Sequence, residues 1–199
     1  RDGTIAGGIL FVGYAAQTVG LEQTTATNSG LITGLYVVFT PLLAAAFARL
    51  RPAASTVLGA SLSVLGLGML TISDSFTLST GDLWTLACAV AFALHIVALA
   101  RMAPRHDVIA FTAVQLLVTA VAALVLSAVF EGAGWPPRSV WLTLALTALV
   151  VTCGAFLVQV WAQTIVGPSR TAIVLALEPL FAVATAAVIL GERLSARGW

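Results

Sequence analysis

Seven long apolar runs, separated by short polar interruptions, constrain the fold of this chain more than any other feature. They cover approximately residues 5–21, 30–48, 55–73, 82–100, 108–130, 140–166 and 171–190. A run of about 20 apolar residues has the length that an α-helix needs to cross a bilayer. The interruptions are too short to hold a soluble domain. The sequence therefore predicts an all-α membrane protein, a polytopic helix bundle.

The composition agrees with lipid as the main solvent. Hydrophobic residues make up 60% of the chain and charged residues 9%, whereas soluble domains carry about 25% charged residues. The net charge of +1 gives no reason to expect nucleic acid as a partner. Cys88 and Cys153 lie inside apolar runs without CxxC spacing, so we expect inert thiols rather than a metal site or a disulfide. No cofactor is predicted.

The seventh run contains a glutamate and a proline, Glu178 and Pro179, well inside its apolar stretch. A carboxylate near the middle of a bilayer costs about 3 kcal/mol, so Glu178 needs a partner, a proton or water. Pro179 has no N–H and leaves the carbonyl of Leu175 without its helical donor. We therefore expect a helix break at Pro179, and a second one at Pro41 in the second run.

The second and seventh runs resemble each other. Superposing them aligns Thr33 with Thr171, Pro41 with Pro179, and Leu42 with Leu180, which we interpret as a diverged internal repeat. These runs are five spans apart, so they cross the membrane in opposite directions. An inverted repeat with broken helices is a recurring plan of secondary transporters, with the substrate near the bilayer midplane.

The first half reads GYAAQTVGLEQTTATNSGLITGLYVVFTPLLA, the fourth run opens GDLWTLACAVAFALHIVALARMAPRHD, and the end reads SRTAIVLALEPLFAVATAAVILGERLSARGW. Together these segments resemble the EamA-like branch of the drug/metabolite transporter superfamily, and LEP followed by GERL is the most specific match. The resemblance implies two inverted five-span repeats and export of small metabolites such as amino acids. It assigns 1–73 to spans three to five of the first repeat and 74–199 to spans six to nine of the second. The chain would then be a fragment without the first two spans and the last.

Polar side chains recur at helical spacing inside several runs, as expected for faces that line a cavity. The alternative is that they only hold helices together, which is the interpretation that we prefer for Gln115, and Tyr36 also suits packing. Gln17 and Gln159 are expected on facing surfaces, and Gly30 and Gly34 are expected to allow close helix approach. The candidates for the substrate cavity are Gln17, Thr33, Tyr36, Thr40, Gln159, Gln163, Thr171 and Glu178.

Two titratable side chains inside spans are candidates for proton coupling, Glu178 and His95. Glu178 could bind a proton or a substrate amine, or it could be held protonated and serve only the fold. His95 could relay protons because histidine titrates near neutrality. The alternative for His95 is a neutral ring that donates to a neighbouring group and has only a structural role.

The broken, inverted spans predict a secondary-active transporter working by alternating access, and the EamA-like resemblance implies an exporter of a small amino acid-like or amphipathic metabolite in the inner (plasma) membrane. The alternative is a membrane-embedded enzyme or a non-transporting structural subunit. The sequence contains no GxSxG, HExxH or glycine-rich phosphate loop, so we do not expect an enzyme. The expected partners are a small-molecule substrate and the lipid bilayer, and a second copy of the chain in a possible homodimer.

The arginines predict the orientation. When successive loops alternate across the membrane, six arginines fall on one side and three on the other, which favours the first side as cytoplasmic. The first side carries Arg1, Arg49, Arg51, Arg101, Arg105 and Arg170, and the other side carries Arg138, Arg193 and Arg197.

A tag between Arg101 and Asp107 is therefore expected in the cytoplasm, and a tag between Gly132 and Pro137 outside. Accessibility labelling of cysteines placed in each loop of the intact protein checks this topology. Labelling of both loops from the same side would contradict the alternation.

Overall fold

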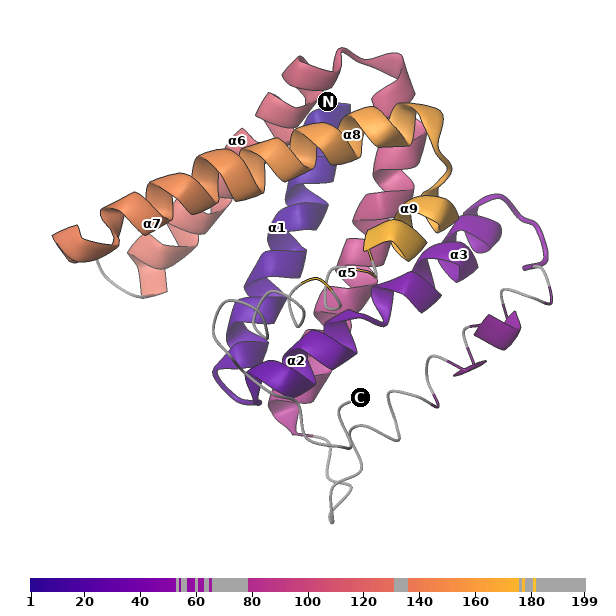
Figure 1. The fold of residues 1–199 in the computed structure, drawn as a ribbon, viewed down its shortest axis with the longest axis horizontal. Coiled ribbons are helices and arrows are strands. Elements are labelled where there is room, and N and C mark those ends of the chain that lie inside the picture. Colours follow the sequence, from indigo (N-terminus) through magenta and orange to yellow (C-terminus); the bar gives the residue numbers. More distant parts are fainter. Residues whose placement is uncertain are drawn as a thin grey trace.

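A computed structural model describes residues 1–52, 79–130 and 136–175, together with 54, 57–59, 61, 62, 65, 177 and 181. All regular secondary structure in these residues is helical (Figure 1), which confirms the all-α prediction for this part of the chain. Within it, four helical segments are long and apolar enough to cross a membrane. They are Asp2–Leu21, Thr80–Arg105, Val108–Phe130 and Arg138–Ile165.

These four segments correspond to the first, fourth, fifth and sixth predicted spans. They contain α1 (Asp2–Leu21), α5 (Thr80–Met102) with the short 3₁₀ helix η1 (Ala103–Arg105), and α6 (Val108–Phe130). The sixth span is a succession of η2 (Arg138–Val140), α7 (Trp141–Leu146), the π-helix η3 (Thr147–Gly154) and α8 (Ala155–Ile165). Most of the third run lies outside the described residues. The seventh run is described at its beginning, in α9 (Pro168–Leu175).

The second span is interrupted at a different place from the one expected. It consists of two short helices, α2 (Ala26–Thr33) and α3 (Tyr36–Phe47), which are separated at Gly34 and Leu35, where the backbone stays right-handed but tightens to hydrogen bonds between residues three apart. Helix α3 continues through Pro41, where the sequence predicted the break. The ring of a proline presses on the carbonyl four residues earlier, so its effect falls on the preceding turn. That turn begins at Val37, two residues after the observed interruption.

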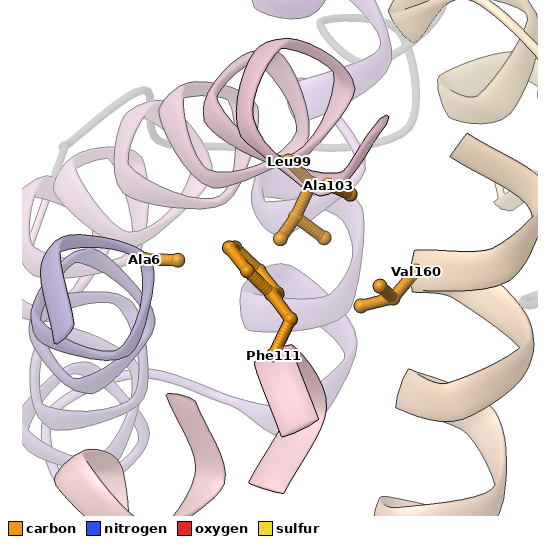
Figure 2. Packing of buried hydrophobic residues seen from close by; sticks show 5 residues of the cluster. All are labelled: Ala6, Leu99, Ala103, Phe111 and Val160. Carbon is orange, nitrogen blue, oxygen red and sulfur yellow. The ribbon is translucent and has the colours of Figure 1, made fainter. Parts of the chain in front are cut away.

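Helix α5 is the centre of the bundle. Helices α1, α2, α3, α8 and α9 all pack against it, and Figure 1 shows α1 running alongside it. One buried cluster joins α5 to α3 and α9 through Tyr36, Ala93, Ile96 and Ala172. A second joins it to α1, α6 and α8, and in Figure 2 the Phe111 ring lies between the other members. The members of this second cluster are Ala6, Leu99, Ala103, Phe111 and Val160.

Glycines allow α1 to approach its neighbours closely. A Cβ added at Gly7 would lie 2.5 Å from the carbonyl oxygen of Gln115 in α6, and one at Gly20 would lie 2.6 Å from the hydroxyl of Thr85 in α5. The hydroxyl of Thr119 uses this proximity and donates to the carbonyl of Gly7 at 3.0 Å. Small residues at helix interfaces have this role in membrane proteins, because packing rather than hydrophobic burial holds helices together in lipid.

The close approach predicted at Gly30 is not found. A Cβ at this position meets no atom of the described residues within 4 Å. The tight contacts belong to α1 instead. The reason is that α1 packs along most of its length against α5 and α6, whereas α2 has only eight residues and ends at the interruption of the second span.

Contacts at one end of the bundle bring together segments that the alternation of loops places on one side. His106, which follows η1, lies with its Nε2 3.0 Å from the carboxylate of Asp2 at the start of α1. The guanidinium of Arg101 lies 5.1 Å from the ring centre of Phe47 at the end of α3. The start of α1, the end of α3 and the end of α5 therefore share one end of the molecule.

The sixth span extends away from the other helices. In Figure 1, α7 and α8 lie nearly in line, with the α7 end farthest from α5. All residues from 138 to 151 are exposed in the described part of the chain. An apolar helix exposed on all sides is suited to contact with lipid. This end of the span does not contribute to the described core.

Two adjacent glycines test the packing of α1. Gly7→Ala is expected to lower stability by about 1–3 kcal/mol, because its methyl group would collide with the backbone of Gln115. Gly8→Ala is the matched control, since a Cβ at Gly8 meets nothing within 4 Å. It is expected to stabilise α1 by about 0.5–1 kcal/mol through helix propensity. Thermal unfolding in detergent measures both, and equal shifts would refute the close contact.

Candidate functional site

His95 and Gln115 form a buried hydrogen bond between α5 and α6. The Nε2 atom of His95 lies 3.0 Å from the Oε1 atom of Gln115, and both side chains are almost fully buried. An amide oxygen can only accept, so the imidazole nitrogen is the donor. The ring of Phe156 from α8 packs edge-on against His95, with 5.9 Å between ring centres. Three helices therefore hold the imidazole in place.

Gln163 connects α8 to the backbone of α5. Its Nε2 atom donates to the carbonyl oxygen of Ile96 at 3.1 Å, and the side chain is buried. The other amide atom, Oε1, has no hydrogen-bond partner among the described residues, and neither has Nε2 of Gln115. Most buried polar groups in proteins are paired. The two unpaired atoms, one acceptor and one donor, therefore mark polar positions in the interior of the bundle.

The polar residues of the second span lie on both sides of its interruption. Thr40 is buried, and its hydroxyl donates to the carbonyl of Tyr36 at 2.7 Å. Tyr36 packs in the cluster with Ala93 and Ile96 of α5. Thr33 lies beside the thiol of Cys88. Its buried hydroxyl nevertheless has no partner in the described part of the chain that meets the distance and angle of a hydrogen bond. Of the three, Thr33 is the residue with an unused polar group.

Gln17 and Gln159, expected on facing surfaces, are not brought together. Both are half-buried. Where α1 and α8 share a cluster, the α1 residue is Ala6 and the α8 residue is Val160, next to Gln159. Ala6 and Gln17 are about 16 Å apart along the helix at 1.5 Å per residue. In Figure 1, α8 crosses α1 near the N-terminal end of α1, whereas Gln17 belongs to the other end of that helix, which explains the separation.

The structure describes only the first residues of the predicted Thr171–Glu178 stripe. Thr171 is buried, and its hydroxyl donates to the carbonyl of Gly167 at 3.3 Å. Glu178 and Pro179 lie outside the described residues, so their roles stay predictions. Among the residues that are described, no group of histidine, cysteine and carboxylate side chains could hold a metal ion.

A polar cluster at the start of α5 was missed at the level of the sequence. Asp82 is buried and accepts from the hydroxyl of Thr24 at 2.6 Å and from the backbone N–H of Ser79 at 2.9 Å. One turn further on, Thr85 is fully buried; its hydroxyl donates to the carbonyl of Gly81 at 2.9 Å and lies 3.5 Å from the hydroxyl of Ser29. The spacing of Ser79 and Asp82 is that of a capping box, a signal that could have identified this helix start.

The His95–Gln115 bond can be tested against the half-buried Gln159. Gln115→Leu is expected to cost about 1–3 kcal/mol of stability, because it leaves the buried ring N–H unpaired. Gln159→Leu is the control and is expected to cost less than about 0.5 kcal/mol. A double variant with His95→Leu should recover part of the loss, since both partners are then apolar. Strictly additive losses in chemical unfolding would show that the bond contributes nothing.

Comparisons with known proteins agree with the helical architecture. The model of the EamA-like transporter family matches residues 79–199. A protein named as an uncharacterized transporter, from Archaeoglobus fulgidus, is 31% identical over 199 residues; the match covers 98% of this chain and 63% of that protein. A solved crystal structure has a TM-score of 0.78 at 22% identity and is matched over 98% of this chain and 69% of its own. This last likeness shows the fold. The chain is thus a multi-pass membrane protein and belongs to the EamA-like transporter family.

Proposed function

We propose that the protein is a secondary-active transporter that exports a small metabolite, amino acid-like or amphipathic, by alternating access. The observation that carries this proposal is the family match over residues 79–199. The chain spans 63% of the length of its curated relative, whose own name specifies a transporter and no substrate. Direction and substrate class rest on the resemblance of the sequence to metabolite exporters.

The interruption of the second span supports a transport site at that level of the bundle. Secondary transporters commonly bind substrate where a membrane helix is broken, because irregular backbone is tolerated there next to a cavity. The interruption at Gly34 and Leu35 has Thr33 on one side and Tyr36 on the other. The unpaired hydroxyl of Thr33 is available to a polar ligand.

Alternating access would follow from an inverted repeat. We assign residues 1–73 to the first repeat and residues 74–199 to the second, with the second and seventh runs as equivalent broken spans. Rocking of one repeat against the other would expose a central site to each side in turn. Among the predicted cavity residues, Gln163 and Thr171 lie in the second repeat, and Gln17 and Thr40 in the first.

Glu178 and His95 are the two candidates for carrying the coupling proton. His95 is enclosed by Gln115 and Phe156, so a proton reaches it only along a polar route through the protein. The sequence places Glu178 one helical repeat after Thr171 and directly before Pro179, where we expect an interrupted hydrogen-bond ladder. We assign the main coupling role to Glu178, and place the protein in the plasma membrane, where a proton gradient is available.

Replacement of Glu178 tests this assignment. Glu178→Gln retains the size of the side chain and removes its titration, so folding should survive while proton-coupled efflux falls at least tenfold. Efflux of a radiolabelled amino-acid mixture from proteoliposomes of the full-length protein measures the effect. Glu22→Gln, at an exposed position after α1, is the control. Unchanged flux and unchanged pH dependence in Glu178→Gln would show that the residue has a purely structural role. Chemical conversion of the added compounds without their movement across the membrane would show that the protein is an enzyme and not a transporter.

A further inference from the structure

One face of α5 carries polar groups from the end of the bundle to the middle of the helix. Thr85, Cys88 and His95 are spaced by three and seven residues, which places them on the same face. All three are buried, with exposed fractions of 0%, 0% and 2%. From Asp82 to His95 the helix rises about 20 Å, or two-thirds of the hydrocarbon thickness. The polar face thus reaches deep into the membrane-spanning part.

Neighbouring helices add polar groups along the same course. Ser29 of α2 lies beside Thr85, and Thr33 of α2 lies beside Cys88. Gln115 of α6 meets His95, and Gln163 of α8 reaches the carbonyl of the adjacent Ile96. Residues from three other helices therefore converge on one line along α5. Packing alone does not require polar residues at these positions, since most of the neighbouring buried side chains are apolar.

The unpaired atoms lie along this line. Thr33 Oγ1, Gln115 Nε2 and Gln163 Oε1 are the buried side-chain atoms without a hydrogen-bond partner in the described part of the chain. Thr33 is beside Cys88, and the two amides are beside His95 and Ile96. Leaving a buried donor or acceptor unsatisfied costs about 1–3 kcal/mol. These groups, one at the level of Cys88 and two at the level of His95 and Ile96, include donors and acceptors and suit water, which forms about three hydrogen bonds when buried.

The line begins at a polar end of the bundle. Asp82, with Thr24 and Ser79 around it, lies at the start of α5. The nearby Glu22 and Gln23, which follow α1, are exposed. This end is opposite the one that holds Arg101 and His106, because α5 runs from one to the other. The Asp82 end is therefore the end of the line that lies nearer to exposed polar side chains.

We propose that the polar face of α5 binds a file of water molecules that connects the Asp82 end of the bundle with His95. The inference rests on the proposed function in one respect, since the file gives His95 the polar route that a coupling proton needs. Its physical content is hydration of Thr85, Cys88 and His95 inside the membrane-spanning bundle. Hydration can be measured without any transport assay.

The two cysteines of the chain supply an internal comparison. Hydroxyl radicals generated by brief radiolysis oxidise side chains next to bound water, and mass spectrometry locates the products. Cys153 in η3 is more exposed than Cys88 in the structure, but lies on the span that faces lipid. With the full-length protein in lipid nanodiscs, the proposal expects Cys88 to be oxidised at least about fivefold faster than Cys153. Phe111, a buried ring away from the file, should stay unmodified.

Thr85→Val removes one hydroxyl from the file at nearly constant shape and is expected to slow oxidation of Cys88 at least about fivefold. The matched control is Thr18→Val, because the Thr18 hydroxyl also donates to a carbonyl of its own helix, that of Tyr14, but is exposed and away from the file. Ser29→Ala makes the same test if Thr85→Val does not fold. Oxidation of Cys88 no faster than that of Cys153, or equal rates in Thr85→Val and the parent, would overturn the proposal. If Cys88 is hydrated but the protein shows no efflux, the water file stands and the transporter proposal is rejected. If the protein shows efflux but Cys88 is not oxidised, the transporter proposal stands and the water file is rejected.

Discussion

The absence of water inside a bilayer is the constraint on which the rest of this structure depends. Backbone groups in hydrocarbon must bond within their own segment, so the spans are helices. Helices in lipid gain little from hydrophobic burial against each other, and close packing and hydrogen bonds replace it. Both are visible here: Gly7 and Gly20 bring α1 against α6 and α5, and the His95–Gln115 bond joins α5 to α6.

The same constraint gives the buried polar groups of α5 their significance. An unpaired polar atom in this environment has no access to bulk solvent, so it costs stability unless a ligand or an internal water satisfies it. Thr33, Gln115 and Gln163 each retain one such atom. We propose that in a protein of a transporter family such groups are available for the molecule or ion that moves. Helix α5 is therefore both the packing centre and the most polar buried helix of the described bundle.

Several features could be predicted from the sequence because they depend on local pattern. Apolar length was sufficient to place four of the spans, and the EamA-like resemblance was confirmed by the family match. Predictions that depended on geometry were less accurate. The interruption of the second span lies at Gly34 rather than at Pro41, and Gly30 has no close neighbour among the described residues. A proline in the sequence identifies a region where the helix is irregular, whereas the packing around it decides which turn departs from α-helical hydrogen bonding.

The sequence by itself determined the solvent, the helical class, the family and the set of polar residues inside the spans, because length, composition and motif are properties of the chain. Only the tertiary structure decided which of those residues meet. It pairs His95 with Gln115 and separates Gln17 from Gln159, since helix crossing angles and positions along the axis are set by side-chain packing between helices. The spacing of residues within one helix determines which of them share a face. The helix that packs against that face depends on how the whole bundle assembles.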